Sequence, residues 1–396
     1  MIQISPETQL FIREHSSDDV RTLALQAKKY PDINMPTAIT QIAGRQVAAE
    51  KIPSWREIEE IWYPKHLSLE QCSSEITARY KARLFQGDSL TDLTGGFGID
   101  CSFLATGFKS ATYVERQEEL CEIAAHNFPI LHLNHINVRN EDGVAYLQTM
   151  SPVDCIFLDP ARRNEHGGKT VAISDCEPNV AELEALLLSK ANRVMIKLSP
   201  MLDLSLALKE LKHTQEIHIL SVNNECKELL ILLRQTSPAE IAIHCVNLLT
   251  KGTQEEQHLV FTREQEQRSQ CTYTDSLGDY LYEPNASLLK AGAFRSIAAA
   301  YPVRKLHPNS HLYISDSFIE NFPGRIFRIV NQCSFNKKEV KENLADLKKA
   351  NVTVRNFPAT VAELRKRLHL TEGGDTYLFA STLNNGQKVI IRCEKV

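Results

Sequence analysis

The residues best suited to chemistry form a glycine-rich turn over Asp92–Asp100, which reads Asp-Leu-Thr-Gly-Gly-Phe-Gly-Ile-Asp. An apolar run ends at Leu93 and another begins at Cys101, so the pattern predicts a strand, a tight turn and a helix. Glycines suit such a turn because they adopt left-handed backbone angles and let a ligand approach the backbone. Free N–H groups at the start of the helix would attract an anionic group. The turn is a candidate ligand site, although its glycines also suit an ordinary strand-to-helix connection.

The spacing of the glycines argues against two phosphate-binding motifs. A P-loop needs Gly-Lys-Ser/Thr after its last glycine, whereas Ile99 and Asp100 follow Gly98. A dinucleotide site needs G-x-G-x-x-G, which this turn lacks, and the acids on either side would repel a pyrophosphate. A cationic ligand fits better, and S-adenosylmethionine carries a sulfonium and an α-ammonium group.

Three later acids extend this hypothesis. Glu115 ends an apolar segment, where a carboxylate can bind both hydroxyls of a ribose. Asp142 follows the next short apolar segment, at the place for an acid beside an adenine. The apolar strand predicted at Val153–Leu158 runs directly into Asp159 and Pro160.

In this order, the four segments resemble the sequence motifs of the class I S-adenosylmethionine-dependent methyltransferases. The resemblance covers roughly residues 87–233. It implies that Asp159 and the carbonyl of Pro160 orient the nucleophile. It also implies a cofactor site made of Asp92, Thr94, Gly95, Gly96, Phe97, Gly98, Glu115, Arg116, Asp142, Gly143 and Asp159.

The residues after Asp159-Pro160 depart from the amine methyltransferases of this family. Ala161 and Arg162 replace the second proline and the aromatic residue that would stack on a base, and Phe97 and Phe157 are weak substitutes. Amine methylation is therefore left open, without a clear stacking residue.

Arg162 also resembles the last residue of the Asp-Pro-Pro-Arg segment in RNA 5-methyluridine methyltransferases. Those enzymes use a cysteine at the end of the next strand, but the matching stretch here is Lys197-Leu198-Ser199-Pro200. We therefore expect direct in-line transfer without a cysteine nucleophile. Lys197 could have a functional role, binding a phosphate or orienting a base. Alternatively, it is a structural lysine whose aliphatic stem lies along apolar surface at a strand end.

Cationic residues follow the predicted catalytic strand. Arg162, Arg163 and Lys169 surround a polar turn, and we interpret them, with Lys197, as substrate-binding residues that meet RNA phosphates. Alternatively, Arg162 pairs with an acid such as Asp175 and only fastens the loop.

Composition places the chain among globular proteins of several domains. The chain has 396 residues, of which 43% are hydrophobic and 24% charged. No apolar run approaches the ~20 residues of a membrane helix, and the N-terminus does not resemble a signal peptide. The ten cysteines form no C-x-x-C pair, and His126, His132 and His135 do not have metal-site spacing. We expect a cytoplasmic protein with reduced cysteines and without a metal.

Charge is distributed unevenly along the chain. Residues 280–396 contain 18 Lys and Arg against 10 Asp and Glu, although the whole chain has a net charge of −4. This excess is typical of an RNA-contacting region, or simply of solvated helices. The segments Phe322-Pro-Gly-Arg325 and Arg355-Asn-Phe-Pro358 make this region resemble a THUMP-like domain, and THUMP domains bind RNA, so the resemblance implies a tRNA or rRNA partner.

The element pattern predicts an α/β fold with a Rossmann-like, doubly wound methyltransferase sheet, because predicted strands and helices alternate from Asp88 onward. A helical region precedes it, including one helix over Ser68–Leu84, and we expect this region to close over the cofactor end of the sheet. The segments Ala242–Leu249 and His258–Phe261 either extend the sheet or form an added ribbon. An α+β domain, ferredoxin-like or THUMP-like, follows, with a helix predicted over Lys337–Ala350 and a hairpin at Asn384-Asn385-Gly386. We expect four parts: 1–86 helical, 87–275 methyltransferase, 276–325 a small α+β linker domain, and 326–396 THUMP-like.

Three functions are compatible with these patterns. The first is methylation of a tRNA or rRNA nucleotide. The second is RNA binding without catalysis, which the altered motif after Pro160 favours. The third is methylation of a small molecule, which would not need residues 280–396.

Overall fold

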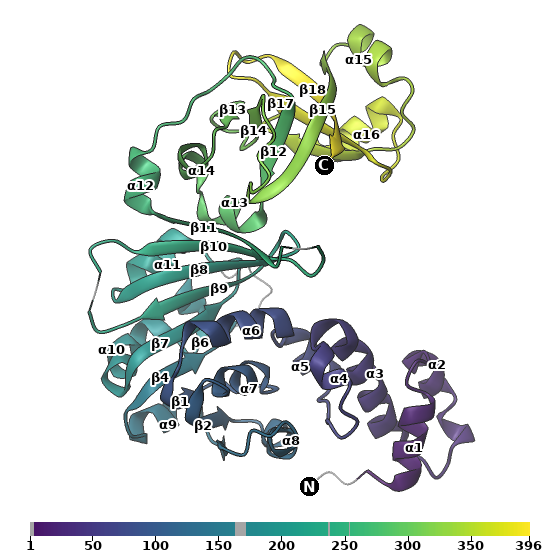
Figure 1. Ribbon diagram of the computed structural model, residues 1–396. Helices are drawn as coiled ribbons and strands as arrows, with labels where there is room; N and C mark the ends of the chain where they lie inside the picture. The colour runs from purple at the N-terminus through teal and green to yellow at the C-terminus, as the bar shows by residue number, and fades with distance from the viewer. Residues whose placement is uncertain (1–3, 163–171, 237, 253) are drawn as a thin grey trace. The chain divides into compact units, whose positions relative to one another are not determined.

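The computed structural model describes residues 4–162, 172–236, 238–252 and 254–396 (Figure 1). The chain forms two compact units. One contains Met1–Gln215 and Leu230–Ser237, and the other contains Glu216–Leu229 and Pro238–Val396. The boundary between the units falls within the two strands β8 and β9. The four-part division expected from the sequence stays a prediction.

The first unit begins with helices, as the sequence predicts. Their starts carry typical caps: the Asp19 side chain, for example, accepts a hydrogen bond from the Thr22 N–H. The helices are α1 (Pro6–Glu14), α2 (Val20–Leu25), α3 (Met35–Lys51), α4 (Pro53–Arg56), α5 (His66–Gln71) and α6 (Glu75–Leu84).

The single helix predicted over Ser68–Leu84 is wrong. It is two helices, α5 and α6, because the backbone is extended at Cys72 and Ser74. This break lets the Ser73 hydroxyl donate to a carboxylate oxygen of Asp100, 2.7 Å away. A contact with a distant residue therefore interrupts a helical pattern that looks continuous in the sequence.

The helices of this region pack next to the glycine-rich turn, which agrees with the expectation that they cover this end of the sheet. Trp55, Ile61 and Tyr63 share a buried apolar cluster with Phe97, which lies between two glycines of the turn, and with Ile99, which follows the last glycine. The Trp55 and Phe97 rings meet edge to face, with centroids 5.3 Å apart.

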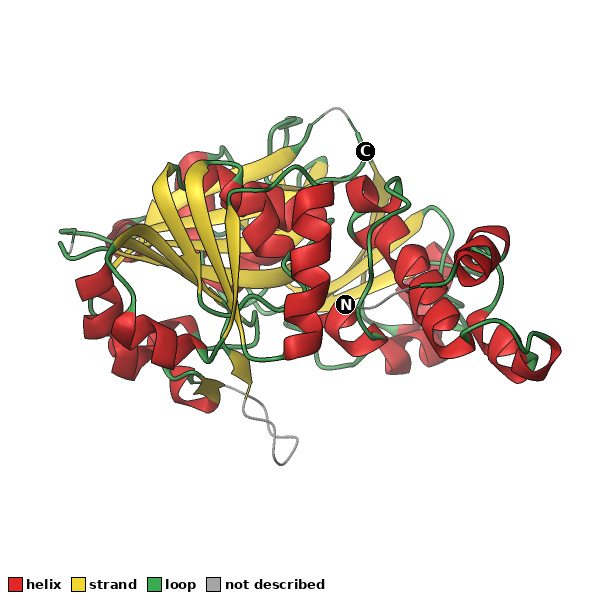
Figure 2. Ribbon diagram, turned by 90° about the horizontal axis from the view of Figure 1, so that it is seen from below, coloured by secondary structure: helices red, strands yellow, loops and turns green. Residues whose placement is uncertain are grey.

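The sheet of the first unit is parallel and has the order β7-β4-β1-β2-β3, as the predicted α/β alternation requires. Helices lie on both faces of these strands (Figure 2). The strands are β1 (Gly87–Asp92), β2 (Phe108–Glu115), β3 (Ile136–Asn140), β4 (Val153–Leu158) and β7 (Ala191–Leu198). The helices are α7 (Ile99–Ala105), α8 (Glu118–Ile130), α9 (Gly143–Thr149), α10 (Val180–Lys190) and α11 (Leu204–Glu210).

Four further strands complete a nine-stranded sheet with the order β11-β10-β8-β9-β7-β4-β1-β2-β3. Of the two expected alternatives, extension of the sheet or an added ribbon, the structure shows the extension, because β10 pairs in parallel with β8 and antiparallel with β11. Asn223 and Asn224, both with positive φ, connect β8 to β9. The strands are β8 (Thr214–Val222), β9 (Glu225–Leu233), β10 (Ala242–Leu248) and β11 (Glu256–Thr262).

The C-terminal part of the second unit is a seven-stranded sheet with the order β13-β14-β12-β15-β18-β17-β16. Its strands are β12 (Tyr280–Pro284), β13 (Arg304–Lys305), β14 (Tyr313–Ser315), β15 (Gly324–Ser334), β16 (Asn351–Arg355), β17 (Thr376–Thr382) and β18 (Lys388–Lys395). Its helices are α13 (Ala286–Ala291), α14 (Phe294–Ala300), α15 (Lys337–Leu344) and α16 (Val361–Leu368), and α12 (Arg263–Arg268) precedes them.

Two local predictions for this sheet had different outcomes. The hairpin predicted from Asn384-Asn385-Gly386 is confirmed, since β17 and β18 pair antiparallel and Gly386 has a φ of 88°. The helix predicted over Lys337–Ala350 is too long, because α15 ends at Leu344. The following residues turn, and the Ala350 N–H donates to the Thr371 carbonyl at 3.0 Å.

Two whole-chain expectations concern membranes and thiols. Among the described residues, no helix has the length and apolar character needed to cross a membrane. All ten cysteines are free, and Cys155 and Cys245 are buried within strands, as their apolar surroundings predict.

Candidate functional site

The glycine-rich turn connects β1 to α7, and its three glycines are required for different reasons. Gly96 and Gly98 have positive φ angles of 53° and 86°. Gly95 is needed for space instead, because a Cβ there would lie 2.2 Å from the ring of Tyr113. A Cβ at Gly96 would meet its nearest heavy atom only at 3.8 Å. The backbone at Gly96 is therefore the part of the turn that a ligand could approach most closely.

The turn lies at the point where the chain reverses its direction across the sheet. From β1 the chain adds β2 and β3 on one side, and β4 then returns to the other side of β1. Ligands of open α/β sheets bind at such a reversal, outside the carboxyl ends of the strands. Here the Leu93 N–H donates to the Phe157 carbonyl at 3.0 Å, and the Asp159 N–H donates to the Thr94 hydroxyl oxygen at 2.6 Å. The predicted catalytic residue is thus tied to the glycine-rich turn.

Glu115 is held at the same turn. One of its carboxylate oxygens accepts from the Gly96 N–H at 2.9 Å, and the other accepts from the Gln117 N–H at 2.8 Å. The residue is buried at 8% exposure. Its predicted contact with ribose hydroxyls would use the lone pairs that these bonds leave free.

Asp142 is the N-cap of α9, a helix that the sequence did not predict. Its side chain accepts hydrogen bonds from the Val144 and Ala145 N–H groups, both at 3.0 Å. The next residue, Gly143, lies against the end of β1, where a Cβ would be 2.1 Å from the Leu93 carbonyl oxygen. Asp142 therefore lies beside the glycine-rich turn, and capping is its visible structural role.

Asp92 lies beneath the turn and is almost fully buried. Its carboxylate accepts from the Thr94 N–H at 3.0 Å. Burial raises the pKa of Asp92 well above its usual value, and that single backbone hydrogen bond opposes the rise.

The Asp159 carboxylate belongs to a network of buried charges. Lys197 Nζ lies 2.5 Å from Asp159 and 3.5 Å from Asp100, and Lys81 Nζ lies 3.0 Å from Asp100. Lys81 is fully buried, whereas the Asp159 side chain remains 36% exposed. Ser73 completes the network by accepting from Lys81 at 3.1 Å and donating to Asp100. One end of the network is closed within protein, and the other end is a solvent-accessible carboxylate.

Electrostatics differ between the two acids of this network. Burial raises the pKa of Asp159, and the nearby ammonium of Lys197 counteracts part of that rise. Burial would also raise the pKa of Asp100, but Lys81 and Lys197 together hold it below the usual value. Asp100 is therefore an ionised acid neutralised inside the protein, and its charge does not attract a ligand as the sequence suggested.

Sequence reasoning missed most of this network. The sequence suggested no role for Lys81, and neither role expected for Lys197 included an ion pair with Asp159. Their partners lie on other elements of the fold, so spacing along the chain could not identify them.

The remaining predicted site residues are less informative. Phe97 is 3% exposed and packs against Trp55, so its side chain has a core role, and Phe157 is buried within β4. Arg116 is exposed, 3.8 Å from Glu177. The backbone of Arg162 pairs with Cys176 in the short strands β5 (Ala161–Arg162) and β6 (Cys176–Glu177). Arg163 and Lys169 lie outside the described residues.

A second acid with two cations occurs in the seven-stranded sheet. Arg325 Nε donates to Glu283 at 2.8 Å, and an Arg355 guanidinium N–H donates to the other carboxylate oxygen at 3.1 Å. The Glu283 side chain is only 3% exposed. Arg325 and Arg355 come from the two segments that gave the THUMP-like resemblance, so both segments meet at one buried acid.

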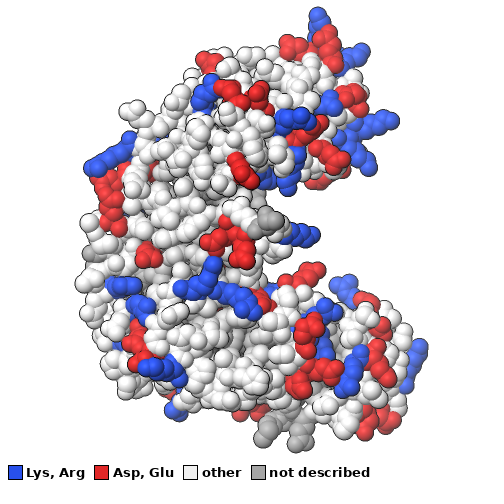
Figure 3. All heavy atoms as spheres, in the orientation of Figure 1, with Lys and Arg blue, Asp and Glu red and all other residues white. Residues whose placement is uncertain are grey.

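The basic excess of this region is mixed with acids on the face that Figure 3 shows. On the face seen in Figure 3, Lys and Arg side chains are interspersed with Asp and Glu over α15 and α16. Several arginines pair with acids, as Arg328 does with Glu394 at 2.6 Å. Exposed cations nevertheless remain on α15 and α16, at Lys337, Lys338, Lys341, Lys366 and Arg367.

Comparison with known proteins adds the family. Residues 280–323 match a ferredoxin-like domain, and residues 324–395 match a THUMP domain-like family. A crystal structure of a protein from Porphyromonas gingivalis W83, assigned as a methyltransferase, is 34% identical over 100% of both chains, with a TM-score of 0.87. The chain belongs to that family, the class I methyltransferases with a C-terminal THUMP-like domain.

Other solved structures resemble this methyltransferase only weakly. An rRNA methylase from Streptococcus thermophilus is 13% identical over 40% of this chain and 94% of its own, with a TM-score of 0.31. A modification subunit assigned to a type I restriction enzyme of Vibrio vulnificus YJ016 is 12% identical over 51% of this chain and 56% of its own, with a TM-score of 0.36. No curated protein matches the chain.

Proposed function

We propose that this methyltransferase transfers the methyl group of S-adenosylmethionine to a nucleotide of tRNA or rRNA. The observation that carries the proposal is the position of Asp159, whose backbone is bonded to Thr94 of the glycine-rich turn and whose carboxylate is still 36% exposed. A nucleophile can therefore meet the carboxylate beside the predicted cofactor site.

The residues of the turn fit the cofactor by their chemistry. Glu115 and Asp142 offer carboxylates at the ends of β2 and β3, and the backbone at Gly96 is open to close approach. Asp92, Thr94, Gly95, Phe97, Gly98, Arg116 and Gly143 would complete the site. When bound, S-adenosylmethionine supplies an electrophilic methyl group on a sulfonium.

The chain's own residues have two tasks in this reaction. The Asp159 carboxylate and the Pro160 carbonyl accept hydrogen bonds from the nucleophile and so aim its lone pair. Lys197 holds the carboxylate in place and favours its ionised form, which is the form able to accept. Because Leu198 stands where a cysteine nucleophile would be, we propose direct in-line transfer.

RNA is the proposed substrate because of the C-terminal domain. The exposed cations of α15 and α16 would bind phosphates, with Arg162, Arg163 and Lys169 as further contacts nearer the reaction. Arg325 and Arg355 are excluded from this role because they bind Glu283.

The test has two stages that fail separately. Thermal unfolding of the full chain should shift upward with S-adenosylmethionine and with its demethylated product. Tritiated methyl should then enter RNA from a strain that lacks the gene, and Asp159→Asn should reduce the rate about 100-fold or more. A thermal shift should persist in this variant, because the glycine-rich turn, Glu115 and Asp142 would still hold the cofactor. The exposed Asp88→Asn is the matched control.

Each negative result has a distinct meaning. Absence of any thermal shift would refute the binding of S-adenosylmethionine. A thermal shift without labelled RNA would favour an RNA-binding protein that has no catalytic activity. Labelling of small amines by a chain without residues 280–396 would favour a small-molecule substrate.

A further inference from the structure

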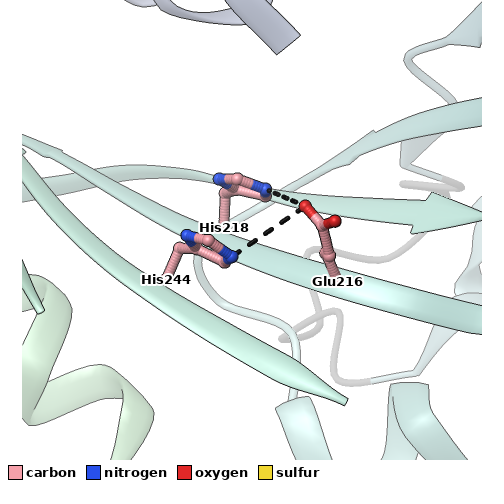
Figure 4. A group of neighbouring side chains, drawn as sticks. All are labelled: Glu216, His218 and His244. Carbon is pink, nitrogen blue, oxygen red and sulfur yellow. Dashed lines mark hydrogen bonds and ion pairs between the residues drawn. The ribbon is translucent and has the colours of Figure 1, made fainter. Parts of the chain in front are cut away.

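The extension of the large sheet carries a group of imidazoles that methyl transfer does not use. Glu216 and His218 are on β8, His244 is on β10, and one potential ligand atom from each lies within 4.8 Å of the others. All three belong to the second compact unit. In Figure 4 both imidazoles direct a ring nitrogen toward the Glu216 carboxylate.

Strand register brings these residues together. His218 and His244 are direct partners across the parallel pair β8 and β10, so their side chains share one face. Glu216 is two residues before His218 on the same strand and therefore lies on that face too. The two rings stack with centroids 4.2 Å apart and an interplanar angle of 12°.

Distances within the group suit a shared ion. The Nε2 atoms of His218 and His244 lie 3.3 and 3.9 Å from the same oxygen of Glu216. Zinc–ligand bonds of about 2.1 Å at tetrahedral angles place neighbouring ligand atoms about 3.4 Å apart. Small rotations of the rings would make their lone pairs converge on one ion.

The neighbouring strand β11 supplies an outer layer. A hydrogen bond of 3.2 Å joins His244 Nδ1 to His258 Nε2, and His258 Nδ1 lies 4.0 Å from Glu256. If His244 donates this bond, its Nε2 keeps the lone pair that faces Glu216. A chain of imidazole and carboxylate behind a ligating histidine is the usual way of fixing its orientation.

Burial is also compatible with a metal. His218 is 2% exposed and His244 is 20% exposed, whereas Glu216 is 45% exposed and leaves a route to solvent. An ion could therefore enter past the carboxylate and reach two imidazoles that are largely shielded from water.

We propose that Glu216, His218 and His244 form a binding site for a zinc-class divalent cation, with His258 and Glu256 as positioning residues. Two imidazoles and one carboxylate favour Zn²⁺ over Mg²⁺ or Ca²⁺, which prefer several oxygen ligands. Three protein ligands leave a fourth position for water. The ion would fasten β8 to β10, and through His258 to β11. The expectation of no metal rested on spacing along the chain, which does not reveal partners on different strands.

The test uses the full chain, reduced and stripped of metal, titrated with Zn²⁺ against a chromophoric chelator. We expect one tightly bound Zn²⁺ per chain, at least about 100-fold weaker binding in His244→Gln and Glu216→Gln, and about 10- to 100-fold weaker binding in His258→Asn. His369→Asn is the matched control, because His369 is exposed and has a left-handed φ of 55° that asparagine also adopts. Far-UV circular dichroism without metal checks that each variant folds.

The spectrum of bound Co²⁺ distinguishes metal binding at this site from metal binding to the cysteines. Co²⁺ should give visible d–d bands without the intense near-ultraviolet band of a thiolate ligand, and His244→Gln should abolish them. The proposal is overturned if the wild-type chain binds no stoichiometric Zn²⁺, if His244→Gln and Glu216→Gln bind it as the wild type does, or if a thiolate band accompanies the bound metal. The first result would mean that the group is a hydrogen-bonded side-chain cluster only.

Discussion

Asp159 and Glu283 are two acids held by cations, one in each compact unit, and they differ in what they leave open. Asp159 is bonded to Lys197 and keeps 36% of its side chain exposed. Glu283 is bonded to Arg325 and Arg355 and is only 3% exposed. Planar guanidinium groups occupy both oxygens of Glu283, whereas the single ammonium of Lys197 binds one oxygen of Asp159. Similar charges thus leave an accessible carboxylate in one unit and form a closed structural joint in the other.

The largest expected effect concerns the closed end of the first network. Lys81→Met should lower the free energy of unfolding of the first unit by about 3 to 5 kcal/mol, because Asp100 would keep a buried charge without its fully buried partner. Trp55 and Trp62 are the only tryptophans, and both lie in this unit, so their fluorescence during urea unfolding reports it.

Lys109→Met is the control for this substitution. Lys109 pairs with Asp88 at the surface, where both side chains are more than two-thirds exposed, and its loss should leave the free energy of unfolding nearly unchanged. Equal effects of the two substitutions would contradict the importance of the buried pair.

A smaller effect is expected at the structural joint. Glu283→Gln should destabilise the second unit by about 2 kcal/mol, because the arginines are about one-third exposed and can turn partly to water. Hydrogen exchange of the β12 and β15 amides should accelerate while tryptophan fluorescence unfolding stays unchanged. Glu394→Gln, which breaks the exposed pair with Arg328, should do neither. Exchange as slow as in the wild type would show that Glu283 does not hold the sheet.

The smallest effect distinguishes a reactive acid from a structural one. Under the proposed mechanism, activity requires ionised Asp159, so the rate should fall as the pH decreases through the pKa of this group. Lys197→Met removes the charge that opposes the desolvation of Asp159, so the pKa should rise further and the acidic limb should move to higher pH. At neutral pH the rate should fall about tenfold, equivalent to one charged hydrogen bond of roughly 1.5 kcal/mol. The measurement is the pH–rate profile of methyl transfer with Lys109→Met as control, and superimposable acidic limbs would refute the role of Lys197.

The sequence was sufficient where the local structure depends on neighbours in the chain. Glycine spacing located the turn at Gly95–Gly98, and alternating apolar segments predicted the parallel strands around it. It was insufficient where distant residues decide the structure. The break at Cys72–Ser74, the pairing of Lys81 with Asp100, and the meeting of Arg325 and Arg355 at Glu283 all depend on contacts between separate elements. The strand register that aligns His218 with His244 is another such case.

The antiparallel pairing of β12 with β15 has a practical consequence for dissecting the protein. The ferredoxin-like match ends at Pro323 and the THUMP-like match begins at Gly324, yet Tyr280–Pro284 are hydrogen-bonded to Gly324–Arg328. Separate expression of residues 324–395 would uncover the unpaired backbone of β15 and invite association with other chains. A fragment that contains the THUMP-like segment should therefore begin before Tyr280 and keep both matched segments together.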